Sequence, residues 1–400
     1  MFKGELKMKF ETVKELTEKA VAQTLGTAYM TAEDGNIRPL ESFRLADVGK
    51  DVLDSGSVDS YVKSLLTQIG KLIIYSDKYK AELPSLFVDS FDWGGYIERV
   101  YFSPQDIVED DMYALVDGKS YDDHKFYKPN VSAKIFEEAK TLTCPISITR
   151  DAVAMAFTNM DEMNRFLSGI YTNVENTITL GMEAYAHMLV SCGIAVSIGA
   201  TSTARHLATE YYGEGFDKTT HTLSKMLKDK DFLRYCLEQI SLTKDRFKRY
   251  TTAFNNKSIP VFTNESQTRL ALLSDFTTAC KFNVSADTFN KEEIGIGSFD
   301  KISSWQAFAD AEKVDFDVTT NSTISISADA ENKLGIGTGE FTKSGIIGVL
   351  YDYRAMGICP QKTKVTSNYT ASADFWNHYH HQLLNYILDP NFSMVAFVLD

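Results

Sequence analysis

The chain has 400 residues, of which 44% are hydrophobic and 24% are charged, a composition typical of a folded globular protein and not of a disordered one. Its formal net charge of -13 argues against a protein that grips nucleic acid, because phosphate binding relies on clustered Lys and Arg. The length exceeds the roughly 250 to 300 residues that one core usually holds, which predicts two lobes or one elaborated domain.

The N-terminal segment predicts two short helices followed by a buried strand. Apolar residues recur at helical spacing over residues 10–25 and 58–69, a glycine follows each run, and residues 72–75 are apolar. The chain begins with a charged, amphipathic stretch that lacks the apolar core of a signal peptide, and its five cysteines include no C-x-x-C pair. We therefore expect synthesis in a reducing cytoplasm and no membrane partner.

Residues 90–149 predict β structure that is rich in charges and turns. Polar and apolar residues alternate over 96–102 and over 144–149. Between these two strands lies the acidic run EDD at 109–111, which is typical of a solvated face or of one complementary to a basic patch on a neighbour. A divalent cation is the alternative partner of this run. Hairpins of this kind need a partner surface, because they rarely stabilise themselves alone.

Residues 161–192 predict the longest helix of the chain. Apolar side chains recur every three or four positions, acidic residues occupy the first turn, and Gly193 is expected to end the helix. About 30 residues at 1.5 Å each give a rod of roughly 45 Å, whereas about 11 to 12 residues is typical of a globular protein. The elements predicted next are helices at 219–240 and near 304–312, and strands near Leu270 and Phe282.

The C-terminal segment predicts two strands on either side of an aromatic block. GIIGVLYDY at 345–353 is expected to form a strand, and a polar span follows through Val365. The block FWNHYHH at 375–381 then leads into a helical pattern, LLNYIL, and a last apolar strand, SMVAFVLD. Aromatics at this density indicate buried packing or a large protein contact. We expect the last strand to close a core.

His378, His380 and His381 form the densest cluster of potential metal ligands in the sequence. In a helix, His378 and His381 would share one face and could bind a metal together. Packing is the favoured interpretation, because aromatic residues surround the three histidines. The glycine runs at 295–297 and 335–339 lack the final glycine of a dinucleotide-binding loop and predict turns. We predict no catalytic, cofactor-binding or metal-binding residues.

Three local stretches carry a resemblance to a known family. They are GYIERVY at 95–101, PNV at 129–131, and the aromatic block leading into MVAFV at 394–398. With the long helix between the second and the third, their order resembles that of the major capsid proteins of tailed bacteriophages, which have the HK-97 fold. The resemblance is closest to the phi-29-like small podophages, and the order of elements covers nearly the whole chain.

The resemblance implies an α+β, HK-97-like fold with an N-terminal arm, an extended β loop, a peripheral domain built on a spine helix, and an axial domain. The implied boundaries are 1–71 for the arm and its short helices, 72–94 for a peripheral strand, 95–147 for the extended loop, 148–219 for the peripheral domain with the spine helix, 220–343 for the axial domain, and 344–400 for the return to the peripheral domain.

The resemblance also implies a structural protein of the virion capsid that has no catalytic residues. It would assemble with itself into pentamers and hexamers of an icosahedral shell and would enclose double-stranded DNA without sequence-specific binding. Scaffolding, portal and head-fibre proteins are the implied partners. An encapsulin-like cargo shell and a metal-dependent enzyme using His378 to His381 are the alternatives.

The residues expected at inter-subunit contacts are Tyr96, Ile97, Glu98, Val100, Tyr101, Glu109, Asp110, Asp111 and Pro129, and those expected in the core are Phe375, Trp376, Tyr379 and Phe397.

Overall fold

The structure is a computed structural model, and it describes residues 82–88, 97–102, 104, 117–118, 124, 128–129, 131–136, 139–149, 160–199, 203–256, 259–283, 298–306, 317–326 and 340–399. Several predicted elements lie outside these residues: the helices at 10–25 and 58–69, the strand at 72–75, the acidic run at 109–111, the two glycine runs, and most of the helix near 304–312.

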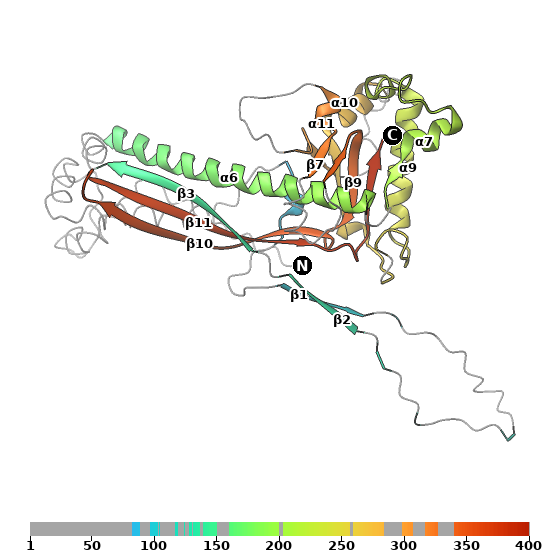
Figure 1. The fold of residues 1–400 in the computed structure, drawn as a ribbon, viewed down its shortest axis with the longest axis horizontal. Helices are drawn as coiled ribbons and strands as arrows, with labels where there is room; N and C mark the ends of the chain where they lie inside the picture. The colour runs from blue at the N-terminus through green and yellow to red at the C-terminus, as the bar shows by residue number, and fades with distance from the viewer. Residues whose placement is uncertain are drawn as a thin grey trace, which may run out of the picture.

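A five-stranded sheet in the order β4-β12-β9-β5-β6 holds the main core (Figure 1). Its strands are β4 (Arg205–His206), β5 (Thr268–Leu273), β6 (Asp300–Ile302), β9 (Ile346–Asp352) and β12 (Met394–Val398). β9 pairs antiparallel with β5 and β12, and the edge strands β4 and β6 pair in parallel. Every residue of β9 and β12 is buried, and apart from Asp352 at the end of β9 neither strand contains a charged residue. The strands predicted near Leu270, at 345–353 and at the C-terminus are confirmed.

Several helices flank this sheet on the side of the C-terminus (Figure 1). The helices predicted at 219–240 are confirmed, and Asp229 caps the longer one by accepting hydrogen bonds from the backbone N–H groups of Asp231 and Phe232. The strand predicted near Phe282 is wrong, because this residue lies in a helix whose buried positions recur at helical spacing. The helices are α7 (Leu207–Tyr212), η3 (Gly213–Gly215), α8 (Leu223–Met226), α9 (Lys230–Arg246), η4 (Glu265–Gln267), α10 (Ser274–Asn283) and α11 (Val318–Asn321). Two short strands, β7 (Ile324–Ile326) and β8 (Phe341–Lys343), pair with each other.

The aromatic block begins a long strand, and the helix predicted after it is wrong. β11 (Phe375–Leu388) runs antiparallel between β10 (Met356–Thr370) and β3 (Ala139–Thr149). Every second side chain in the first part of β11 is buried, which is the period of a strand. Pairing with two neighbours outweighs the helix propensity of LLNYIL, which amounts to less than about 1 kcal/mol per residue. The strand predicted at 144–149 is confirmed as part of β3.

Helix α6 (Met160–Ile198) confirms the predicted long helix and continues past Gly193, its predicted end. Its 39 residues span about 58 Å. It lies along β3 and β11 and reaches the five-stranded sheet with its C-terminal part (Figure 1). A Cβ atom at position 193 would overlap with Sδ of Met356, so the glycine allows close packing of α6 against β10. Gly193 is therefore a packing residue and does not end the helix.

The C-terminal part of α6, Val174–Ile198, is long and apolar enough to cross a membrane by length and composition alone. Its most apolar stretch is 61% buried inside the molecule. Ala186, Leu189 and Ile194 of this stretch belong to the main hydrophobic core. Packing in the core therefore accounts for the apolar character of the helix.

Strands β1 (Ile97–Phe102) and β2 (Val131–Phe136) form a two-stranded antiparallel hairpin that projects from the body of the molecule (Figure 1). This confirms the strand predicted over 96–102. The segment 82–88, with the short helix η2 (Pro84–Leu86), runs beside β10, and the backbone N–H of Val88 donates to the carbonyl oxygen of Ile358 at 2.9 Å.

Candidate inter-subunit hairpin and its anchor

The β1–β2 hairpin has two chemically different faces. Paired residues of an antiparallel ladder lie on the same side, so Arg99 and its partner Lys134 share one face with Tyr101. The opposite face carries four large apolar side chains that are 46–70% exposed: Val100, Phe102, Val131 and Ile135. We call these four residues the apolar face of the hairpin.

Asp389 holds the other face of the hairpin against the body. Its carboxylate is fully buried and accepts a hydrogen bond from the Tyr101 hydroxyl. Nη1 of Arg99 lies 3.6 Å from Oδ2 of Asp389, and Nζ of Lys134 lies 3.9 Å from Oδ1. Burial, together with the hydrogen bond to Asp389, raises the pKa of Tyr101 far above its ordinary value, so the hydroxyl stays protonated and donates. Both strands are therefore tied to one carboxylate.

A second ion pair lies beside this carboxylate, around the ring of Phe392. The guanidinium of Arg354 lies 4.5 Å from the ring centroid and that of Arg99 lies 5.4 Å from it. Buried Asp352 fixes Arg354 through hydrogen bonds of 2.6 Å from Nη2 and 2.9 Å from Nε. Pairing of this kind compensates for the cost of burying the carboxylates. We call Arg99, Tyr101, Lys134, Asp352, Arg354, Asp389 and Phe392 the hairpin anchor.

The comparison with protein families decides what kind of molecule this is. The family described as Phi29-like phage major capsid protein matches residues 28–398, which include the hairpin, α6 and the closing strand. The chain belongs to this family. The capsid protein is thus a structural shell protein, and capsids are built from many copies of such a chain.

A solved phage capsid shares the fold of this capsid protein. A chain in the capsid structure of Staphylococcus phage Andhra has 12% identity and a TM-score of 0.50, with 80% of this chain and 84% of that chain covered. This match confirms the predicted HK-97-like α+β fold.

Two further solved structures match less closely. A chain from the structure of head fiber and inner core protein gp22 of bacteriophage P68 matches with a TM-score of 0.47 at 10% identity, covering 80% of this chain and 85% of that one. A chain of the cyanophage P-SCSP1u capsid matches with a TM-score of 0.45 at 10% identity, covering 78% and 86%. No curated protein sequence matches the capsid protein.

The residues predicted for inter-subunit contacts lie on both faces of the hairpin. Glu98 and Val100 are exposed on the side of the apolar face, whereas Tyr101 is buried in the hairpin anchor. Ile97 opens β1, and Pro129 is exposed shortly before β2. Tyr96, Glu109, Asp110 and Asp111 lie outside the described residues. A role of these residues in contacts stays a prediction.

The four residues predicted for the core divide into two pairs. Trp376 and Phe397 are buried, in β11 and β12 respectively. Phe375 and Tyr379 are half-buried, because they lie on the face of β11 opposite to Trp376. The aromatic block therefore contributes to two surfaces of one sheet.

Sequence reasoning missed the hairpin anchor. Tyr101 and Asp389 are 288 positions apart, and no motif connects them. One signal was available: Asp389 directly follows the apolar end of β11, where an unpaired buried carboxylate would be costly. That signal predicts a partner for Asp389 but does not identify it.

The metal site considered for the histidines is wrong, because these residues lie in a strand. His378 and His380 are fully buried on one face of β11. His381 lies on the other face, where its ring nitrogens are 3.0 Å from Oγ1 of Thr143 and 2.9 Å from Oγ1 of Thr366. His378 and His381 therefore cannot share an ion, and the enzyme alternative built on them loses its basis.

The buried face of β11 packs under α6. His380 is paired with Cys144 of β3, and Cys144 packs against Val174 and Ile178 of α6. Among the described residues, no hydrogen-bond partner reaches a ring nitrogen of His378 or His380. Burial, together with the charge of a neighbouring histidine, lowers the pKa of each of these histidines to about 4.

These buried histidines predict loss of stability in acid. In the unfolded chain they bind protons below about pH 6.5, whereas in the folded chain they stay neutral down to about pH 4. The free energy of unfolding should therefore fall as the pH drops from 6.5 to 4, by up to roughly 3 kcal/mol per histidine, and then level off. Denaturant unfolding of the subunit across this range measures the effect.

The double variant His378→Leu/His380→Leu should remove most of this pH dependence, and His221→Gln, in a half-buried position outside β11, should keep it. A double variant with the same acid sensitivity as the parent would show that other groups cause it.

Proposed function

We propose that the capsid protein forms pentamers and hexamers of an icosahedral shell around double-stranded DNA, and that its hairpin lies over the neighbouring subunit. The apolar face of the hairpin carries this proposal, because its four residues are exposed while the opposite face is held by the hairpin anchor. Contiguous apolar surface of this kind marks a protein contact.

Closed rings of identical chains require contacts between unlike surfaces of the subunit. The hairpin supplies one such surface, because it projects from the body and is fixed at its base (Figure 1). An isolated two-stranded hairpin is marginally stable in water. A neighbouring subunit that covers the apolar face would therefore stabilise the hairpin and the ring together. Obligate interfaces between subunits commonly bury about 2,000 Å² or more, and packing of the hairpin on a neighbouring subunit would contribute to such an area.

Within this proposal, residues 95–147 act as the extended loop, 148–219 carry the spine helix, and 220–343 form the axial domain. The return segment 344–400 contributes β9 and β12, which share a sheet with β5 and β6 of the axial stretch. Continuous pairing across this boundary supports a rigid connection between the two segments.

The charge of the chain supports a container that does not bind DNA sequence-specifically. A net charge of -13 gives the shell little affinity for phosphates, so the genome is held by enclosure. The proposal includes scaffolding, portal and head-fibre proteins as partners, synthesis in the cytoplasm of a bacterial host, and a purely structural role without catalysis.

Expression of the full chain, alone and with a candidate scaffolding protein, tests this function by electron microscopy and sedimentation. We expect closed particles of uniform diameter in at least one condition. Only monomers under every condition would contradict the proposal. Particles from infected cells that contain a cargo enzyme in place of DNA would favour an encapsulin-like shell and would also contradict it.

A further inference from the structure

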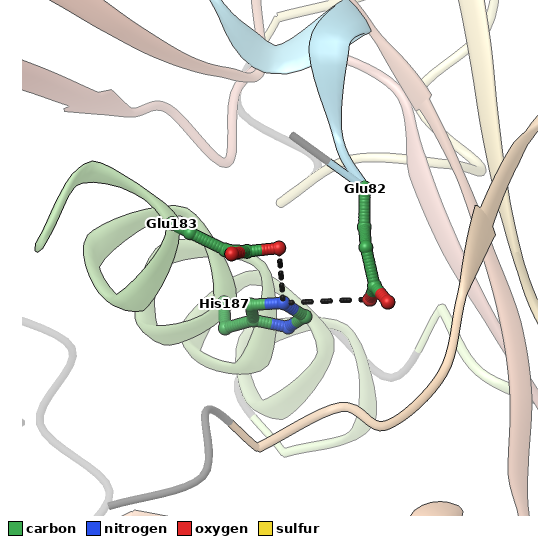
Figure 2. A group of neighbouring side chains, drawn as sticks. All are labelled: Glu82, Glu183 and His187. Atoms are coloured by element: carbon green, nitrogen blue, oxygen red, sulfur yellow. Dashed lines mark ion pairs between the residues drawn. The ribbon is translucent and has the colours of Figure 1, made fainter. Parts of the chain in front are cut away.

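Three potential metal ligands converge where the long helix meets the segment before the hairpin (Figure 2). Glu183 and His187 lie one turn apart on α6, and Glu82 comes from the residues just before η2. Nε2 of His187 lies 3.7 Å from Oε2 of Glu82 and 4.0 Å from Oε1 of Glu183. One ligand atom of each side chain lies within 4.8 Å of the others.

The surrounding structure positions these side chains. Oε2 of Glu82 accepts a hydrogen bond of 3.0 Å from the backbone N–H of Ser303, which directs this carboxylate toward His187. Glu183 and His187 stand at i and i+4, the spacing that places two side chains on one face of a helix. His187 is buried, and both carboxylates are partly exposed, so an ion and a water molecule have access.

The charges at this cluster favour a cation. Two carboxylates face the same point, and no Lys or Arg among the described residues forms an ion pair with either of them. Burial lowers the pKa of His187, and the charges of Glu82 and Glu183 oppose this shift without reversing it. The imidazole is therefore neutral at pH 7 and offers a lone pair.

The dimensions suit a zinc ion. Zn²⁺ binds imidazole nitrogen and carboxylate oxygen at about 2.0 to 2.2 Å, so tetrahedral ligands lie about 3.4 Å apart. Both carboxylates need to approach Nε2 of His187 by a few tenths of an ångström, because these distances are 3.7 and 4.0 Å. The two carboxylate oxygens, which lie within 4.8 Å of each other, need to approach by up to about 1.4 Å, which flexible glutamate side chains allow. Mg²⁺ and Ca²⁺ prefer shells of oxygen, whereas imidazole favours zinc and other transition metals.

We propose that Glu82, Glu183 and His187 bind one Zn²⁺ ion per subunit, with water as the fourth ligand. The ion connects segments that are about 100 positions apart in the chain, the residues before η2 and the middle of α6. The segment 82–88 already pairs with β10 and contacts Ser303, and the ion would add a further attachment of this segment to the body. This inference does not depend on assembly, since the ligands belong to one chain.

Metal binding by the full-length chain tests the site directly. After dialysis against a chelator, the protein is titrated with Zn²⁺ and the bound metal is measured by mass spectrometry, and Co²⁺ is used as a spectroscopic probe. We expect one Zn²⁺ per chain, a tetrahedral Co²⁺ absorption band, and slower hydrogen exchange of residues 82–88. Glu183→Gln should weaken binding at least tenfold.

Glu175→Gln is the matched control, because Glu175 is also half-buried on α6, about two turns earlier. It should bind Zn²⁺ like the parent chain. Glu82→Gln provides an independent second variant on a different segment. Absence of stoichiometric Zn²⁺, or equal affinity of Glu183→Gln and the parent, would overturn the proposal. A cluster that is stabilised only by protonation of His187, with stability rising in acid and unchanged by Zn²⁺, would overturn it as well.

Discussion

Phe102→Asp should prevent shell assembly and leave the subunit folded. Phe102 is 70% exposed on the apolar face, so its replacement removes few contacts within the chain. In a ring the new carboxylate would be buried without a partner, which costs about 3 kcal/mol or more at each contact. Since each 1.4 kcal/mol is a factor of ten, we expect particle yield to fall at least about a hundredfold. Sedimentation and particle counting measure this yield.

The matched control for this variant is Phe282→Asp. Phe282 has the same side chain and is 71% exposed, but it lies on α10, on the opposite side of the body from the hairpin (Figure 1). Both variants should keep the free energy of unfolding of the subunit within about 0.5 kcal/mol of the parent. Assembly of Phe102→Asp at the parental yield would show that the apolar face is not a contact.

Asp389→Ala should release the hairpin from the body of the subunit. The substitution leaves the Tyr101 hydroxyl and the charges of Arg99 and Lys134 without their buried partner. Removing one member of a buried ion pair costs about 3 to 5 kcal/mol, and we expect the lower end because Lys134 is 40% exposed. Denaturant unfolding measures this loss, and hydrogen exchange should accelerate in β1 and β2.

Asp245→Ala is the control for the anchor. Asp245 at the end of α9 pairs with Lys248 on the surface, where water screens such pairs and leaves them a small contribution to stability. If Asp389→Ala costs no more than Asp245→Ala, and exchange in β1 stays slow, the hairpin is held by contacts other than the hairpin anchor.

Much of the fold could be predicted because its signals are local. The apolar residues of α6 repeat at helical spacing, and β9 and β12 are short apolar runs bounded by turns, so period and length identify them. The alternation in β1 is of the same kind. Each of these elements is identified by the spacing of its apolar residues, and this spacing is visible in the sequence.

The errors arise where pairing between distant segments decides the structure. LLNYIL has helical spacing, yet it continues β11, because β10 pairs with it through Leu388 and β3 pairs with it through Asn385. Gly193 looks like a helix stop, but Met356 packs so closely against it that a Cβ atom there would force the methionine side chain to shift. In both cases the partner lies far away in the chain, so a local pattern cannot reveal it.

The candidate site was only half predictable for the same reason. Val100 and its neighbours alternate in a way that predicts a strand with one apolar face. The hairpin anchor, by contrast, joins Tyr101 to Asp389, and the proposed zinc site joins Glu82 to His187. Polar side chains that meet only in the folded chain carry no spacing that a sequence shows.

A reconstruction of the assembled shell by electron cryomicroscopy at side-chain resolution tests the central claim most directly. We expect the reconstruction to show Phe102 and Val131 buried against the adjacent subunit in every pentamer and hexamer. The hairpin anchor should be intact at the base of each hairpin. A shell in which the apolar face is open to solvent, or packs only on its own subunit, would contradict it.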